Sequence, residues 1–77
     1  MAHHNWAREA LRLHKREMAV AIKLLLREHK LTLEAAALEL IVSTGTMSKA
    51  SNQNSAESVS LDLLFYIHYS LDHHKLA

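Results

Sequence analysis

The sequence predicts a small all-α domain, and three features of its composition support this. The 77 residues include one glycine and no proline, so the residues that form tight hairpin turns are scarce. Hydrophobic residues make up 49% of the chain, more than a disordered chain contains. The absence of cysteine excludes disulfides and thiolate metal ligands. We therefore expect one helical domain over residues 1–77, and not a β-sandwich, a nucleotide-binding α/β domain or a zinc finger.

The first predicted helix is unusually long and covers about residues 5–29. Asn5 is a good N-cap residue, because its side chain can accept from the free amides of the first turn. Apolar residues at spacings of seven, four and three place one stripe toward the core: Leu11, Met18, Ile22 and Leu25. Such a length exceeds the mean for a helix in a globular domain. Either the helix bends, or its first three turns extend beyond the core and contact another subunit.

Two shorter helices are expected next. Thr32 is a suitable N-cap for a helix ending near Ile41, and Ser43 for a helix over about 44–52. The third helix consists largely of small polar residues, which compete with the backbone for hydrogen bonds and form helices poorly on their own. Tertiary contacts must therefore hold it, which suggests that its outer face is used.

A loop over residues 53–59, with one helical turn at most, separates these helices from the last one. Ser60 is expected to cap that helix, which covers about residues 61–73. The predicted inward stripe consists of Leu61, Leu64, Phe65, His68 and Leu71.

The charge is distributed unevenly along the chain. Residues 1–30 contain seven basic and three acidic side chains, whereas residues 31–77 contain two basic and five acidic ones. The formal total of +1 therefore hides one positively charged segment. No uncharged apolar run is long enough for a membrane span, and the N-terminus is charged where a signal peptide needs an apolar core. We expect no membrane association and a cytoplasmic location.

Residues 31–52 follow a pattern typical of two short helices joined by a tight turn. They read LTLEAAALELIVSTGTMSKASN, which resembles the helix-turn-helix of the phage repressor and Cro-type (XRE-like) DNA-binding family. The positions that match are Leu31, Thr32, Ala37, Leu40, Val42, Ser43, Thr46, Ser48, Lys49 and Asn52, with Met47 a near match. Farther on, the residues from Ser60 to Leu64 resemble the start of the family's final helix. The resemblance extends over residues 16–72 and implies a compact lambda-repressor-like domain of four to five helices.

One departure from the family pattern concerns the turn. Ile41 stands where the family has glycine, and a β-branched residue adopts a positive φ only with strain. Either the turn has a different geometry or the second helix continues through it. The position usually occupied by leucine or valine is Ala36, which leaves core volume for the long first helix to fill.

The resemblance implies a set of DNA-contacting residues, each with a purely structural alternative. Lys49 contacts a phosphate or a guanine, or is a solvated lysine; residues 44–46 approach the major groove, or only form a first helical turn. Ser43 and Asn52 donate to phosphates or act as caps. Because the third helix has one basic residue, basic side chains of the first helix are expected to contact phosphates: Arg12, Arg16, Lys23 and Arg27. The DNA-binding set is Ser43, Thr44, Gly45, Thr46, Lys49, Asn52 and Arg27.

The resemblance implies a sequence-specific transcriptional regulator, a phage or bacterial repressor that binds a palindromic operator as a homodimer. The alternative is a helix-turn-helix scaffold that binds protein, such as a small phage-encoded inhibitor of a host protein, because residues 31–77 are net negative. No catalytic constellation and no H-E-x-x-H spacing is present, so we expect neither an enzyme nor a metal or other cofactor. Three aromatic residues fill the core or form a subunit interface: Trp6, Tyr66 and Tyr69.

Overall fold

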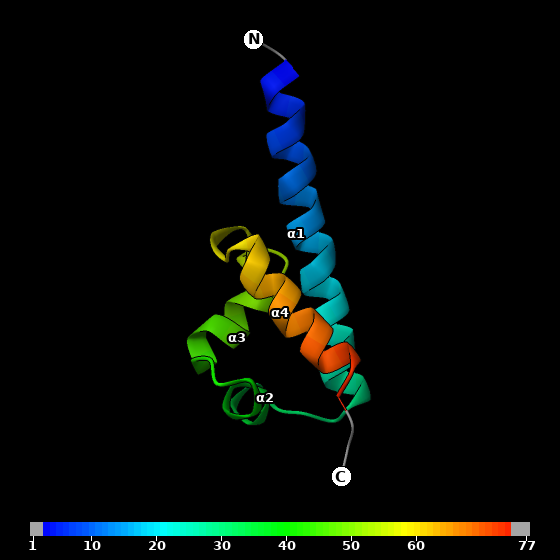
Figure 1. Cartoon of the computed structure of the whole chain (residues 1–77), viewed down its shortest axis with the longest axis vertical. Helices are drawn as coiled ribbons and strands as arrows, with labels where there is room; N and C mark the ends of the chain where they lie inside the picture. The colour runs from blue at the N-terminus through cyan, green and yellow to red at the C-terminus, as the bar shows by residue number, and fades with distance from the viewer. Residues whose placement is uncertain (1–2, 75–77) are drawn as a thin grey trace.

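Four α-helices and one short 3₁₀ helix make up the chain (Figure 1). The computed structural model describes residues 3–74, and this part of the chain contains no β-strand. The all-α prediction is therefore confirmed for these residues. The elements are α1 (His3–Glu28), α2 (Leu33–Leu40), α3 (Thr44–Ala50), η1 (Ala56–Ser58) and α4 (Leu61–Asp72).

Hydroxyl side chains start three of the helices, as the sequence predicts. In each case the side-chain oxygen accepts a hydrogen bond from the backbone amide three residues later, at 3.0 to 3.2 Å. This bond satisfies one of the amides that a first helical turn leaves without an intrahelical partner. The caps of α2, α3 and α4 are Thr32, Ser43 and Ser60.

The core lies where the second half of α1 packs on α4 and where α2 packs on α3 (Figure 1). Met47 from α3 is fully buried at the centre of the helix pair. The large side chains that are completely removed from solvent come from α1, α3 and α4: Ile22, Met47, Leu64, Ile67 and Leu71. The four helices therefore share one core, into which α2 contributes mainly small side chains.

Some details of the predicted helices are wrong. Asn5 is not a cap, because α1 already begins at His3. Leu11 and Phe65 are exposed, whereas Leu26 and Ile67 are buried. In α4 the buried positions follow a spacing of three and four from Leu64, which turns Phe65 outward. Leu11 is exposed because the other helices do not reach the first turns of α1 (Figure 1).

The third helix ends at Ala50, two residues before the predicted end. The hydroxyl of the buried Ser51 donates to the Met47 carbonyl oxygen at 2.9 Å, and the amide of Asn52 donates to the Lys49 carbonyl oxygen at 3.3 Å. A serine that bonds back to the preceding turn in this way competes with helix continuation. The predicted helical turn in the following loop is present as η1.

Ile41 ends α2 in the left-handed conformation, with φ 57° and ψ 49°. Its amide donates to the Leu38 carbonyl oxygen at 3.3 Å, and the amide of Val42 donates to the Ala37 carbonyl oxygen at 3.0 Å. This bonding pattern is a Schellman motif, which usually has glycine at the left-handed position. The side chain of Ile41 is 89% exposed. Neither of the two alternatives for this turn is observed, because the chain adopts the positive φ despite the β-branched residue and α2 ends at Leu40.

α1 is one continuous helix whose first three turns extend beyond the other helices (Figure 1). The molecule consequently measures 51 Å along its longest axis and 20 by 17 Å across. Arg12 tethers α1 to η1, because its Nη1 lies 3.6 Å from an oxygen of Glu57. Lys15 donates from Nζ to the Glu57 carbonyl oxygen at 3.3 Å. Of the two expectations for this helix, extension beyond the core is the one observed.

Candidate nucleic-acid interface

α2 and α3 form a helix pair whose facing side chains are buried. Ala37 and Leu40 of α2 and Met47 and Ala50 of α3 are all nearly or fully removed from solvent, and Val42 between the helices is half-buried. A small side chain on α2 permits the close approach that such a pair needs. Ala37 and Met47 thus point inward, as the sequence predicts.

The N-cap and first turn of α3 hold four of the predicted contact residues, and two of their hydroxyls form local hydrogen bonds. Ser43 accepts from the Thr46 amide at 3.0 Å and donates to the Thr46 hydroxyl at 2.8 Å. Thr46 is half-buried beside this cap, whereas Thr44 and Gly45 are exposed. The helix cap therefore already uses the hydroxyls of Ser43 and Thr46. Thr44 is the member of this group whose side chain stays available for an external contact.

Gly45 is not required by the backbone of α3. Its φ lies outside the left-handed region, and a Cβ added there would meet nothing closer than the Ser43 hydroxyl oxygen, at 3.9 Å. Glycine within a helix costs about 0.5–1 kcal/mol relative to alanine. Its presence on the exposed face thus has no structural explanation within this chain, and it leaves the backbone open to close approach from outside.

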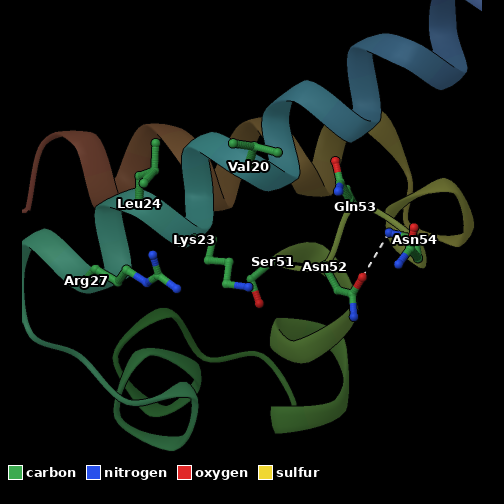
Figure 2. A pocket seen from close by; sticks show the side chains of 8 residues that line it. All are labelled: Val20, Lys23, Leu24, Arg27, Ser51, Asn52, Gln53 and Asn54. Carbon is green, nitrogen blue, oxygen red and sulfur yellow. Dashed lines mark hydrogen bonds between the residues drawn. The ribbon is translucent and has the colours of Figure 1, made fainter.

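The other end of α3 faces the last turns of α1 across a hollow of about 380 Å³ (Figure 2). Lys23 and Arg27 extend from α1 toward Ser51 and Asn52, which lie just after α3 (Figure 2). The side-chain oxygen of Asn52 accepts from the Asn54 amide at 2.8 Å. A neighbouring hollow shares Lys23, Arg27 and Asn52 and adds Ser48. The fold thus brings together two cations and several neutral hydrogen-bonding groups.

The predicted DNA-binding set is therefore divided over the length of α3. Residues 43–46 lie at its start, and Arg27 and Asn52 line the same hollow at its end. Lys49 is exposed on the last turn and does not line the hollow. Ser48 was not among the predicted site residues. Its sequence signal is its position four residues before Asn52, which places the two on one face.

Electrostatics favours an anion at this end of the molecule. Between Glu39 and Glu57 the sequence has no acidic residue. In the part of the chain that the structure describes, no ion pair involves Lys23, Arg27 or Lys49. Their positive charges are consequently not neutralised within the protein.

Arg12, by contrast, is engaged away from α3. It donates from Nε to a carboxylate oxygen of Glu9 at 3.1 Å and from Nη2 to the other oxygen. This bidentate bond lowers the pKa of Glu9 and raises that of Arg12. Together with the Glu57 contact, it makes Arg12 a link between α1 and η1, and not a free cation for phosphates.

Comparison with family models, with curated proteins and with solved structures gives no match for this chain. The helices of residues 3–74 include none long and apolar enough to cross a membrane. Over the same residues, no group of three or more histidine and carboxylate side chains is placed to hold a metal ion.

Proposed function

We propose that the protein is a sequence-specific DNA-binding regulator, a phage or bacterial repressor in type, in which α3 enters the major groove. One observation carries the proposal: the exposed side of α3 presents short polar side chains and Lys49, and the end of α3 lies beside cations that no carboxylate of the described residues neutralises. Short polar side chains at the start of a recognition helix contact base edges, and neighbouring cations contact phosphates. In this arrangement Thr44 and Lys49 contact bases, while Lys23 and Arg27 lie against the backbone.

The proposal includes a homodimer on a palindromic operator. Two recognition helices related by a two-fold axis bind half-sites about 34 Å apart, one turn of the duplex. We place the protein in the bacterial cytoplasm on this functional argument.

Binding of duplex DNA tests the proposal. Fluorescence anisotropy with DNA from upstream of the protein's own gene, and with duplexes selected from a random pool, would measure affinity and specificity. We expect Lys49→Ala to weaken binding to the preferred duplex by about 1–3 kcal/mol if it contacts a base. Arg8→Ala, which removes the same charge from the far end of α1, is the control and should have little effect. Failure to bind any selected duplex would overturn the proposal.

The salt dependence assigns the phosphate contacts. Each neutralised phosphate contributes about 0.9 to the slope of log affinity against log salt concentration. Lys23→Ala and Arg27→Ala should each reduce that slope by about 1 without changing which sequence is preferred. Slopes identical to that of the unmodified protein would place these two side chains away from the DNA.

A second candidate function, protein binding by the same helix pair, is favoured by a different observation. Leu38 and Ile41 are large apolar side chains on the outer side of α2, and both are more than four-fifths exposed. Residues 31–77 are also net negative. A complex with DNA that does not weaken as salt rises, or a helix α3 that tolerates both Thr44→Ala and Lys49→Ala, would favour this alternative.

A further inference from the structure

α1 carries a second apolar stripe on the side opposite its buried face. Large apolar side chains are exposed there, Trp6 by 68%, Leu13 by 47% and Leu24 by 57%. The spacing along the stripe alternates between four and three residues, which is the heptad spacing of a coiled-coil seam. Its members from residue 6 to 24 are Trp6, Ala10, Leu13, Glu17, Val20 and Leu24.

The stripe borders a continuous depression in the surface. The hollow beside Lys23 and a second hollow of about 360 Å³ share Val20 and Gln53. Gln53 extends toward α1 and forms one side of this depression, while Val20 and Leu24 lie on the other (Figure 2). A helix laid along the stripe would therefore contact apolar side chains on α1 and the polar loop after α3.

The exposed area is larger than expected for a protein of this mass. A compact monomer of 8.7 kDa has an accessible surface of about 4,700 Å². This chain exposes 5409 Å². The excess of about 700 Å² is close to the roughly 800 Å² that each partner contributes to a standard interface. The excess accessible area is thus about equal to one partner's share of a standard interface. The elongated shape that produces it comes from the projecting first turns of α1.

We propose that this stripe pairs with the same stripe of a second copy, in an antiparallel coiled coil of two α1 helices. A parallel pair would place Glu17 against Glu17 and Arg27 against Arg27 at the seam, where like charges repel. In the antiparallel register centred near Lys15, Trp6 meets Leu24 of the partner subunit. Ala10 meets Val20 of the partner subunit, a small side chain against a large one.

The flanks carry both attractive and repulsive pairs in this register. On one flank Glu9 faces Lys23 of the partner subunit, twice in the symmetric pair, and Arg16 faces Arg16 of the partner subunit between them. Glu9 stays bonded to Arg12 of its own chain, which leaves Lys23 available for phosphate. At the seam, Glu17 of the partner subunit meets Leu13, and Arg16, one turn farther along the flank, is the oppositely charged neighbour of that carboxylate. On the other flank, Ala7 meets Ala21 of the partner subunit, and both are small enough for close helix packing.

The pairing specifies how the two subunits of the dimer in the proposed function contact each other, and it rests on that proposed function. In an antiparallel pair the two flanks that carry Lys23 lie on the same side of the seam. With a rise of 1.5 Å per residue, the two Arg27 residues are about 36 Å apart along the helix axes. That separation is close to the 34 Å of one DNA turn. The two cation clusters therefore face the same side at a spacing that suits successive grooves.

Sedimentation of the full chain without DNA tests the seam. We expect a dimer at tens of micromolar for the unmodified protein, a monomer for Leu13→Asp and a dimer for Leu11→Asp. Leu11 is the matched control, because it is 44% exposed against 47% for Leu13 and lies on the same helix but off the stripe. Circular dichroism would check that both variants stay helical. A monomeric unmodified protein, or equal disruption by both variants, would overturn the pairing.

Disulfide formation tests the orientation, because the chain has no native cysteine. The double variant Ala10→Cys with Val20→Cys should form covalent dimers on oxidation, whereas neither single variant should. A single variant that links readily would indicate a parallel pair and overturn the register. A dimer that passes both tests but binds no duplex would overturn the DNA proposal alone, which separates the two failures.

Discussion

The hydroxyl of Tyr66 donates to the carbonyl oxygen of Leu40 at 2.7 Å. Leu40 is the last residue of α2, so its carbonyl has no partner within the helix. This one bond therefore connects α4 to the end of α2, next to the turn that orients α3.

Removing this hydroxyl should destabilise the domain. We expect Tyr66→Phe to lower the free energy of unfolding by about 0.5–1.5 kcal/mol, the usual contribution of a hydrogen bond. Urea denaturation followed by circular dichroism would measure it. Tyr69→Phe is the control, since no hydrogen bond to that hydroxyl is present in the described residues. Equal effects of the two substitutions would contradict the role of the Leu40 bond.

Replacing Ile41, the turn residue with a positive φ, should instead stabilise the domain. Ile41→Gly should raise the free energy of unfolding by about 1 kcal/mol, because glycine adopts a positive φ without a steric penalty and little packing is lost at an exposed side chain. Leu38→Gly, at an exposed position inside α2, should instead lower it by about 1 kcal/mol. Thermal unfolding of the two variants under one buffer condition tests the difference in sign.

At Gly45, stability and binding should change in opposite directions. Gly45→Ala should stabilise the fold by about 0.5–1 kcal/mol, because there is room for the methyl group and alanine favours the helix. If the α3 backbone lies against DNA, the same methyl group should weaken duplex binding. Urea denaturation and anisotropy on one preparation separate the effects, and tighter DNA binding would place this turn outside the interface.

A charged substitution should unfold the domain at position 47 but be tolerated at the exposed position 48. Met47 is fully buried, so Met47→Asp places a charge in a small core and should abolish the cooperative unfolding transition. Ser48→Asp adds the same charge at an exposed position one residue later and should leave the fold intact. Its expected effect is weaker DNA binding, through repulsion of phosphate. A folded Met47→Asp variant would show that α3 packs differently.

The Glu9 carboxylate should titrate below its ordinary value of 4.5, because Arg12 donates to it. A pKa lowered by folding stabilises the helix above the ordinary value, and this stabilisation is lost as the pH falls through the folded-state pKa. Carbon-detected NMR of the carboxyl group would follow the titration. Arg12→Ala should return the pKa toward 4.5, whereas Arg8→Ala should leave it unchanged.

The elements were largely predictable because local chemistry determines them. Thr32, Ser43 and Ser60 cap helices wherever the neighbouring residues favour helix, and no tertiary information is needed to find them. Leu11 and Phe65 were misplaced for a different reason. Whether an apolar side chain is buried depends on which other element reaches it, and the sequence does not show where the rest of the fold ends along α1.

The sequence predicts which α3 side chains are exposed, but not how the surrounding elements are arranged. The motif places Thr44 and Lys49 on the outer side of α3, and both are exposed. Arg27 and Asn52 line one hollow because the last turns of α1 lie beside the end of α3, which is a tertiary relationship between residues far apart in the chain. Sequence spacing carries no signal for such an arrangement.

The projecting turns of α1 have a consequence for folding. Residues 5–11 are exposed, so their helical state depends mainly on local hydrogen bonds, and a helix end with few tertiary contacts frays readily. A second chain along the stripe would add packing that the local bonds lack. Protection of the amides of residues 5–11 from hydrogen exchange would then rise with protein concentration, while that of α4 would stay nearly constant. The amount of protein in the cell would thereby set how much of it is fully ordered.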